Sequence, residues 1–147
     1  MRVREVILQT LVTGAGGFLG RAIVRALRQR GAAVRGLARG DYPALRDQGV
    51  EMIRGDIRDA QTVLSACHQV DVVFHTAAVA GIWGPWQHFH SINTVGTEHV
   101  IAACRAHRVP RLVFTSSPSV TFDGGDQTDV DESAPYATRW LCHYPHT

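Results

Sequence analysis

The chain has 147 residues, of which 45% are hydrophobic, and a formal net charge of +2. This length and composition fit one soluble globular domain with a sizeable core. The basic residues are scattered rather than gathered into a run, so nucleic acid is not expected as a partner. Gln9, Thr10 and Thr13 interrupt the first apolar run, which argues against a signal peptide or a membrane span.

A glycine-rich stretch, residues 13–20, follows the apolar run Val6–Val12 and precedes a segment with apolar residues at helical spacing. The run predicts a buried parallel strand. Gly14 is expected in a tight turn, Gly17 close to a pyrophosphate, and Gly20 where a helix packs tightly on the strand. Backbone N–H groups and the helix dipole would then bind a diphosphate. The alternative is a strand-to-helix turn that binds no ligand.

Strands and helices alternate along the rest of the chain. The predicted elements are helix 18–30 with Gly31 after its end, strand 33–38, short helix 43–48, strand 50–55, helix 60–67 with Asp59 as N-cap, strand 71–74, helix 89–107 and strand 112–114. The apolar strands and the βαβ spacing predict an α/β fold, a Rossmann-like doubly wound parallel sheet of about five strands in the order 3-2-1-4-5.

Neither the acidic loop nor the histidines and cysteines predict a metal site or a disulfide. The acidic residues between 123 and 132 lack the residue order of a calcium loop, so a solvated loop is expected. His88 and His90 are two residues apart, and a helix would direct them to different faces. The cysteines are odd in number and lie in or beside apolar or helix-like segments, which favours reduced thiols and a cytoplasmic location.

Several conspicuous motifs follow predicted strands, and ligands of open α/β sheets bind beyond the carboxyl ends of the strands. The motifs are Thr13-Gly14-x-x-Gly17-x-x-Gly20, Gly55-Asp56-Ile57, His75-Thr76-Ala77-Ala78, Asn93-Thr94-Val95-Gly96-Thr97, Thr115-Ser116-Ser117 and Tyr144. With them the chain resembles the extended short-chain dehydrogenase/reductases (the NAD(P)-dependent epimerase/dehydratase superfamily). Residues 80–86, 118–120 and 123–126 are similar to the 3β-hydroxysteroid dehydrogenase-like branch, and more narrowly to bacterial reductases of 2-alkyl-3-oxoalkanoates.

The resemblance implies an NADP(H)- or NAD(H)-dependent oxidoreductase that interconverts a secondary alcohol and a ketone on a large apolar substrate. It gives Ser117 the hydrogen bond to the substrate oxygen and Tyr144 the proton exchange, and it places a lysine directly after Thr147. It implies Trp83 and Trp86 at the substrate mouth. The cofactor-binding residues that it implies are Gly14, Gly16, Gly17, Phe18, Leu19, Gly20, Arg39, Asp56, Ile57, Ala77, Ala78, Asn93 and Thr115.

Arg39 favours NADP(H) over NAD(H), because an arginine suits a 2′-phosphate where NAD-preferring relatives have an acidic residue. Structural alternatives stay open: a solvated Arg39, a turn residue at Ser117, a half-buried aromatic at Tyr144 and a surface polar residue at Asn93. We further expect residues 1–147 to be a dinucleotide-binding domain that is incomplete at its C-terminus and lacks the substrate region. The parent protein is expected to be a homodimer, and the chain alone a non-catalytic cofactor-binding fragment, pseudoenzyme or sensor.

Overall fold

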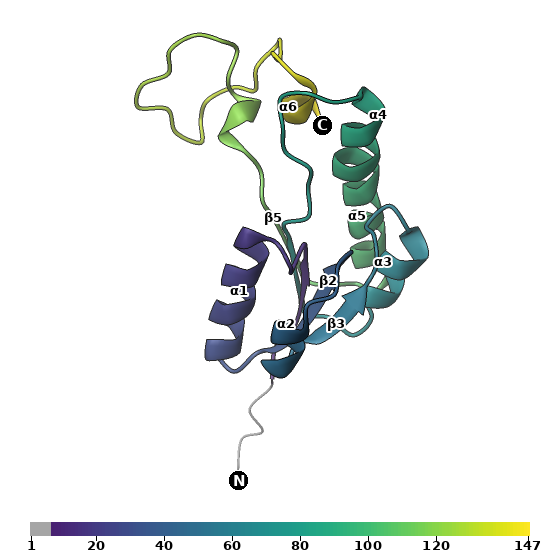
Figure 1. The fold of residues 1–147 in the computed structure, drawn as a ribbon. Helices are drawn as coiled ribbons and strands as arrows, with labels where there is room; N and C mark the ends of the chain where they lie inside the picture. Colours follow the sequence, from purple (N-terminus) through teal and green to yellow (C-terminus); the bar gives the residue numbers. More distant parts are fainter. Residues whose placement is uncertain (1–6) are drawn as a thin grey trace.

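The computed structural model describes residues 7–147, which contain a parallel sheet with the strand order β3-β2-β1-β4-β5 (Figure 1). The strands are β1 (Gln9–Thr13), β2 (Ala33–Ala38), β3 (Glu51–Arg54), β4 (Val72–His75) and β5 (Arg111–Phe114). The helices are α1 (Phe18–Gln29), α2 (Pro43–Asp47), α3 (Ala60–Ala66), α4 (Trp86–Phe89), α5 (Gly96–Ala106) and α6 (His143–His146). The predicted Rossmann-like fold and its strand order are confirmed.

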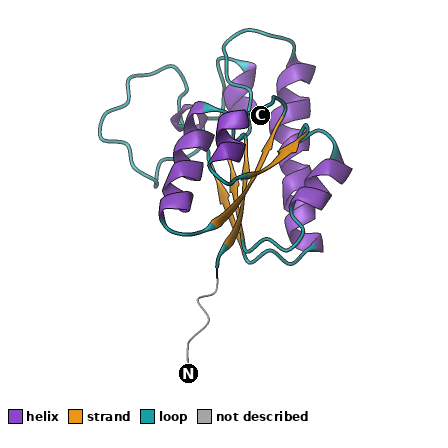
Figure 2. Cartoon of the chain, turned by 60° about the horizontal axis from the view of Figure 1, so that its bottom comes forward, coloured by secondary structure: helices purple, strands orange, loops and turns teal. Residues whose placement is uncertain are grey.

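Helices cover both faces of the sheet (Figure 2). Successive residues of a strand point to opposite faces, so β1 contributes to two separate cores. Leu11 packs in the core that includes residues of α3 and α5, and Val12 packs in the core that includes residues of α1 and α2. Both side chains are fully buried. This double burial explains why the adjacent residues Leu11 and Val12 of β1 are both apolar.

The first strand begins later than the apolar run predicts. Val6 lies outside the described residues, while Ile7 and Leu8 precede the strand and are 59% and 43% exposed. The ladder with β2 begins at Gln9, and the ladder with β4 begins at Thr10. The prediction of a buried strand over Ile7 and Leu8 was therefore wrong, because a strand is defined by its neighbours and not by its own hydrophobicity.

The helix ends follow the sequence signals closely. The carboxylate of Asp59 accepts hydrogen bonds from Gln61 N (3.0 Å) and Thr62 N (3.3 Å), which confirms Asp59 as the N-cap of α3. Gly31 follows α1 with a φ of +77°, the left-handed conformation that a residue after a helix commonly adopts. Asp59 and Gly31 thus define the ends of these helices by local chemistry alone.

The predicted helix 89–107 is not uniformly α-helical. It begins at Trp86 with α4, continues through a π-helical segment, His90–Val95, and ends with α5 at Ala106. A π-helical segment widens the helix and is often found at functional sites. Asn93 lies in this segment, where its side chain reaches the backbone of Val79.

Candidate active site

The glycine turn lies at the carboxyl end of β1 and leads into α1. Gly14 has a φ of +70°, and its N–H donates a hydrogen bond to Leu37 O (2.8 Å), which attaches the turn to β2. A side chain at Gly14 would meet the backbone of Ala77 at 2.9 Å. Among residues 7–147 no side chain caps the start of α1, so its first N–H groups suit an anion beside the turn.

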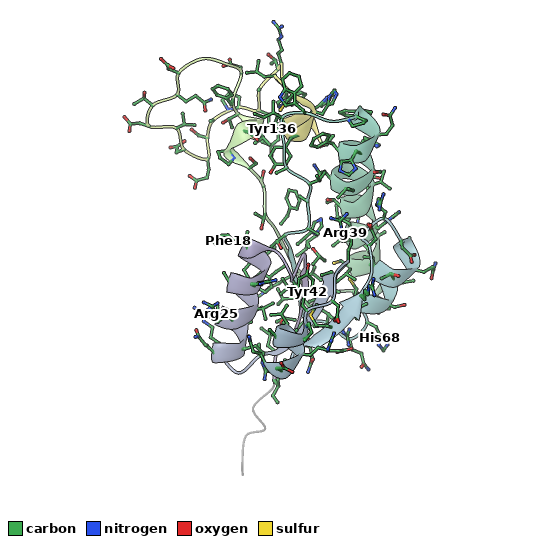
Figure 3. All side chains as sticks on the ribbon, in the orientation of Figure 1. Phe18, Arg25, Arg39, Tyr42, His68 and Tyr136 are labelled. Atoms are coloured by element: carbon green, nitrogen blue, oxygen red, sulfur yellow. The ribbon has the colours of Figure 1, made fainter. Side chains whose placement is uncertain are left out.

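A cavity of about 260 Å³ opens beside this turn. The residues predicted to bind the cofactor that line it are Gly14, Gly16, Gly17, Arg39, Asp56, Ile57, Ala77 and Ala78. Five other predicted residues do not line this cavity, and two of these, Asn93 and Thr115, line the second cavity described below. Phe18 is 96% exposed at the start of α1 (Figure 3), Leu19 is 43% exposed, and Gly20 is buried beneath the turn against Gly14.

Tyr42 also lines the first cavity, and the sequence did not single it out. Its ring lies so close to Gly16 that a side chain at Gly16 would overlap it, and the Arg21 guanidinium lies 5.3 Å from the ring centre. Tyr42 precedes the short helix α2 and belongs to no motif. Its position depends on how α2 packs beside the turn, which explains why periodicity could not reveal it.

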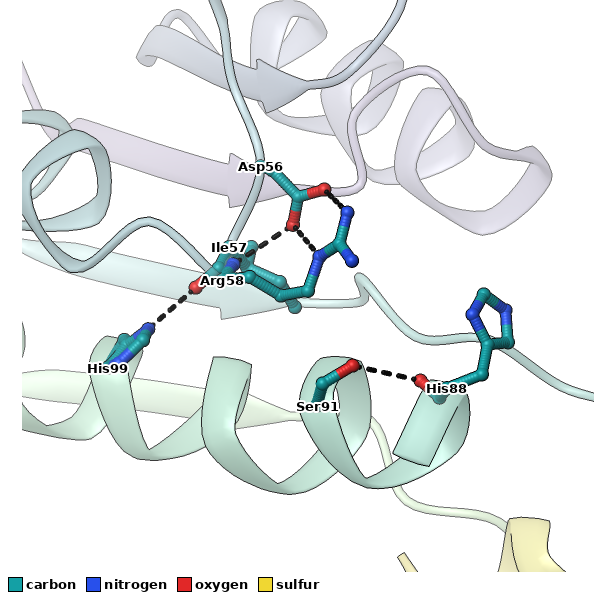
Figure 4. A network of polar contacts seen from close by, with 6 residues as sticks. All are labelled: Asp56, Ile57, Arg58, His88, Ser91 and His99. Atoms are coloured by element: carbon teal, nitrogen blue, oxygen red, sulfur yellow. Dashed lines mark hydrogen bonds and ion pairs between the residues drawn. The ribbon is translucent and has the colours of Figure 1, made fainter. Parts of the chain in front are cut away.

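Asp56 and Ile57 are held in place by neighbouring side chains (Figure 4). Arg58 donates to the Asp56 carboxylate from its backbone N (2.9 Å), its Nε (3.1 Å) and its Nη2 (2.7 Å). These hydrogen bonds lower the pKa of Asp56 below its ordinary value. His99 on α5 donates from Nδ1 to Ile57 O (2.9 Å). The segment after β3 is thereby fixed along the wall of the cavity.

A second cavity of about 280 Å³ adjoins the first, and Ala77 and Ala78 line both. The sequence-predicted residues that line this second cavity are Asn93, Thr115, Ser117 and Tyr144, together with Ala77 and Ala78. Ser117 Oγ lies 2.7 Å from Ser119 Oγ and accepts a hydrogen bond from Ser119 N (3.3 Å). The structure therefore brings together, at one cavity, the two residues for which a chemical role is predicted.

Three aromatic side chains in this second cavity were not predicted from the sequence. They are Phe114 at the end of β5, and Tyr136 and Trp140 from the segment that follows the acidic loop. Figure 3 labels Tyr136 near the end of the molecule where α6 lies. That segment has no periodic pattern, so only the tertiary structure shows that its aromatic rings reach the cavity.

Asn93 bonds to the main chain of Val79 and lines the second cavity. Its Oδ1 accepts from Val79 N (2.9 Å), and its Nδ2 donates to Val79 O (3.0 Å) and to Thr147 Oγ1 (3.0 Å). The side chain is almost fully buried. The alternative of a surface polar residue is therefore wrong.

Trp83 and Trp86 do not line either of these two cavities. Trp83 is 90% exposed. The ring of Trp86 lies 5.3 Å from that of His90 and 5.0 Å from that of His146, so it packs α4 against α6. A role of either tryptophan at a substrate mouth stays a prediction.

Three sequence expectations concern groups outside the two cavities. Cys67 and Cys104 are buried free thiols, as expected, whereas Cys142 is only half-buried. Over residues 7–147 we find no cluster of three or more His, Cys, Asp or Glu side chains suited to a metal ion. Within the same residues no helix has the length and apolar character needed to cross a membrane.

Known proteins of one family match most of this chain. The model of the 3-beta hydroxysteroid dehydrogenase/isomerase family matches residues 11–147. A 2-alkyl-3-oxoalkanoate reductase of Shewanella oneidensis is 45% identical over 141 residues, which cover 96% of this chain and 36% of the relative. A protein of the same name from Stenotrophomonas maltophilia is 49% identical over 140 residues, or 88% of this chain and 42% of the relative. The chain thus spans well under half the length of these relatives.

Solved structures with bound NAD have the same fold. The structure of MoeE5 in complex with UDP-glucose and NAD has a TM-score of 0.82 at 30% identity, and the match covers 94% of this chain and 44% of that chain. A short-chain dehydrogenase/reductase superfamily protein from Agrobacterium tumefaciens with bound NAD has a TM-score of 0.80 at 31% identity, with coverages of 93% and 40%.

Proposed function

Since the chain belongs to the 3-beta hydroxysteroid dehydrogenase/isomerase family, we propose that it forms the cofactor-binding part of a reductase or dehydrogenase. The reaction would interconvert a secondary alcohol and a ketone on a large apolar substrate. The observation that carries this proposal is the pair of adjoining cavities that share Ala77 and Ala78. The glycine turn borders one cavity, and Ser117 and Tyr144 border the other.

The residues that line the first cavity have the chemistry that suits a dinucleotide. The N–H groups at the start of α1 and the turn at Gly14 suit a pyrophosphate, and Asp56 and Ile57 suit the adenine side. When bound, the nicotinamide supplies or accepts the hydride. Ser117 would donate a hydrogen bond to the substrate oxygen, and the hydroxyl of Tyr144 would exchange a proton with it.

The second cavity supports an uncharged, apolar substrate portion. Among its described lining residues, none carries a charged side chain, and Phe114, Tyr136 and Trp140 contribute aromatic surface. Apolar pockets with a few polar groups bind mainly through burial of hydrophobic area. A 3β-hydroxysteroid or the alkyl part of a 2-alkyl-3-oxoalkanoate has this character.

We expect Arg39→Ala to weaken NADPH binding about tenfold and to change NADH binding less than about twofold, because the guanidinium would pair with the 2′-phosphate. Arg39 is exposed at the end of β2 and lines the first cavity. Fluorescence titrations of the unaltered chain and of Arg39→Ala with NADPH and with NADH would measure both changes in affinity. Arg25→Ala, on the exposed side of α1, is the control. Tighter binding of NADH than of NADPH by the unaltered chain would contradict the preference.

A second candidate function is cofactor binding without catalysis. The 15 Lys-or-Arg residues of the chain are all arginine, so the sequence contains no lysine. A tyrosine with its ordinary pKa of about 10 needs a nearby ammonium group to act as a base near neutral pH. We therefore expect these 147 residues to bind NADPH but to show no NADPH oxidation with 3-oxo substrates. Measured turnover would contradict this candidate and favour the first.

A further inference from the structure

His75 lies at the centre of a buried chain of hydrogen bonds. It is 1% exposed at the end of β4. Its Nδ1 lies 2.6 Å from Thr13 Oγ1 on β1, and its Nε2 lies 2.9 Å from Thr97 Oγ1 on α5. Its ring also packs against that of Phe114 on β5, with 5.7 Å between the ring centres. All three of these neighbours are uncharged, so none of them would stabilise a protonated imidazole.

The hydrogen bond from Thr97 to Asn93 determines which nitrogen of the His75 imidazole carries the proton. Thr97 Oγ1 lies 2.5 Å from Asn93 O, and a carbonyl can only accept, so the hydroxyl proton of Thr97 is used there. Toward His75 the Thr97 oxygen must therefore accept, and Nε2 must be the protonated nitrogen. In a neutral ring Nδ1 is then the acceptor, and the hydroxyl of Thr13 donates to it.

Two further contacts close this series of hydrogen bonds into a ring of hydrogen bonds that includes backbone residues 77–79, between the two cavities. Thr13 Oγ1 accepts a hydrogen bond from Ala77 N (3.3 Å). At the other end Asn93, whose carbonyl accepts from Thr97, holds both the N–H and the carbonyl of Val79 through its side-chain amide. The backbone is thus fixed on either side of Ala78, which lines both cavities.

We propose that His75 is a positioning residue: as the neutral Nε2–H tautomer it joins Thr13 to Thr97 and so fixes backbone 77–79 between the two cavities. The ring of bonds is a property of the folded chain itself. Its consequence for cofactor binding rests on the proposed function, because it assumes that the first cavity binds a dinucleotide. The Thr97 hydroxyl is the link whose removal opens the ring with the smallest change in shape.

The tautomer can be measured on the unaltered chain. Two-bond proton–nitrogen NMR correlations of the histidine rings at pH 7 should show His75 with a protonated Nε2 and a bare Nδ1. A protonated Nδ1, whether in the other tautomer or in an imidazolium, would overturn the proposal. This measurement requires no variant and no cofactor.

The ring of hydrogen bonds is tested with the variant Thr97→Val, which keeps the shape of the side chain and removes its hydroxyl. We expect amide hydrogen exchange at Ala77 and Val79 to become at least about tenfold faster. Thr97→Ser, which restores the hydroxyl, should return both rates to within about twofold of the original. Thr10→Val is the matched control, since its buried hydroxyl also donates to a backbone carbonyl, that of Ala33 (3.0 Å), but outside the ring. Equal exchange in all three variants would overturn the proposal.

The consequence for the cofactor is measured as the Kd for NADPH. Thr97→Val should raise this Kd about tenfold, while Thr97→Ser and Thr10→Val leave it within about twofold. An unchanged Kd in Thr97→Val, with exchange accelerated, would overturn the positioning role. If the unaltered chain binds neither NADPH nor NADH, the proposed function fails, and the tautomer and exchange measurements still decide the ring.

Discussion

Lowering the pH from 7.5 to 4.5 is expected to reduce the free energy of unfolding by about 2.5 kcal/mol through His75 alone. Burial lowers the pKa of His75 from 6.5 to about 4. Between these values the unfolded chain binds a proton that the folded chain does not bind, so acid favours unfolding. The stabilisation is complete above pH 6.5 and is lost as the pH falls to about 4.

Urea unfolding at pH 7.5, 5.5 and 4.5 measures this loss. In His75→Gln the side chain cannot titrate, so the decline over this range should largely disappear, whatever the variant's stability at pH 7.5. Hydrogen bonds lower the pKa values of the Asp56 and Asp59 carboxyls below 3.8. Protonation of these two groups therefore reduces the free energy of unfolding only at a lower pH than that of His75. The same decline in His75→Gln as in the unaltered chain would contradict the assignment.

Gly20→Ala is expected to lower the free energy of unfolding by about 3 kcal/mol and to weaken NADPH binding. A Cβ at this buried position would lie 2.1 Å from Gly14 O and 2.9 Å from Ala15 Cα. Both are backbone atoms, so no side-chain rotation relieves the overlap, and the glycine turn itself must move. Thermal or urea unfolding and nucleotide titration measure the two effects.

Gly31→Ala is the matched control for this substitution. Gly31 has a φ of +77°, and no atom of the described residues lies within 4 Å of the added Cβ, so among these residues only the left-handed backbone opposes the methyl group. Its cost should be about 1 kcal/mol, with NADPH binding unchanged. Gly20 lies in α1 and does not have a positive φ, so equal losses of stability in the two variants would contradict the expected cost of close packing at Gly20.

The elements with strong periodicity were predicted well from the sequence. The alternation of buried strands and amphipathic helices was sufficient for the fold class and for the order β3-β2-β1-β4-β5. The spacing of the glycines placed the turn after β1, and the carboxyl-end rule brought Arg39 and Asp56 to the same cavity. These features depend on local chain geometry and on general rules of βαβ connection, which a sequence pattern carries directly.

Features that depend on contacts between distant segments could not be predicted. The apolar residues Ile7 and Leu8 lie outside the sheet because the ladders of β1 begin at Gln9 and Thr10. Trp86 packs between His90 and His146 and does not line either cavity. In each case contacts with residues remote in the sequence determine where the side chain lies.

His75 shows the division most clearly. The sequence alone placed it directly after the predicted strand 71–74, as the first residue of the motif His75-Thr76-Ala77-Ala78. Only the tertiary structure supplied Thr13 from β1 and Thr97 from α5, and the bond from Thr97 to Asn93 O requires the proton on Nε2. Local pattern is sufficient to form strands, helices and the glycine turn. The protonation state and the fixed backbone between the two cavities come from hydrogen bonds between residues 22 and 62 positions apart.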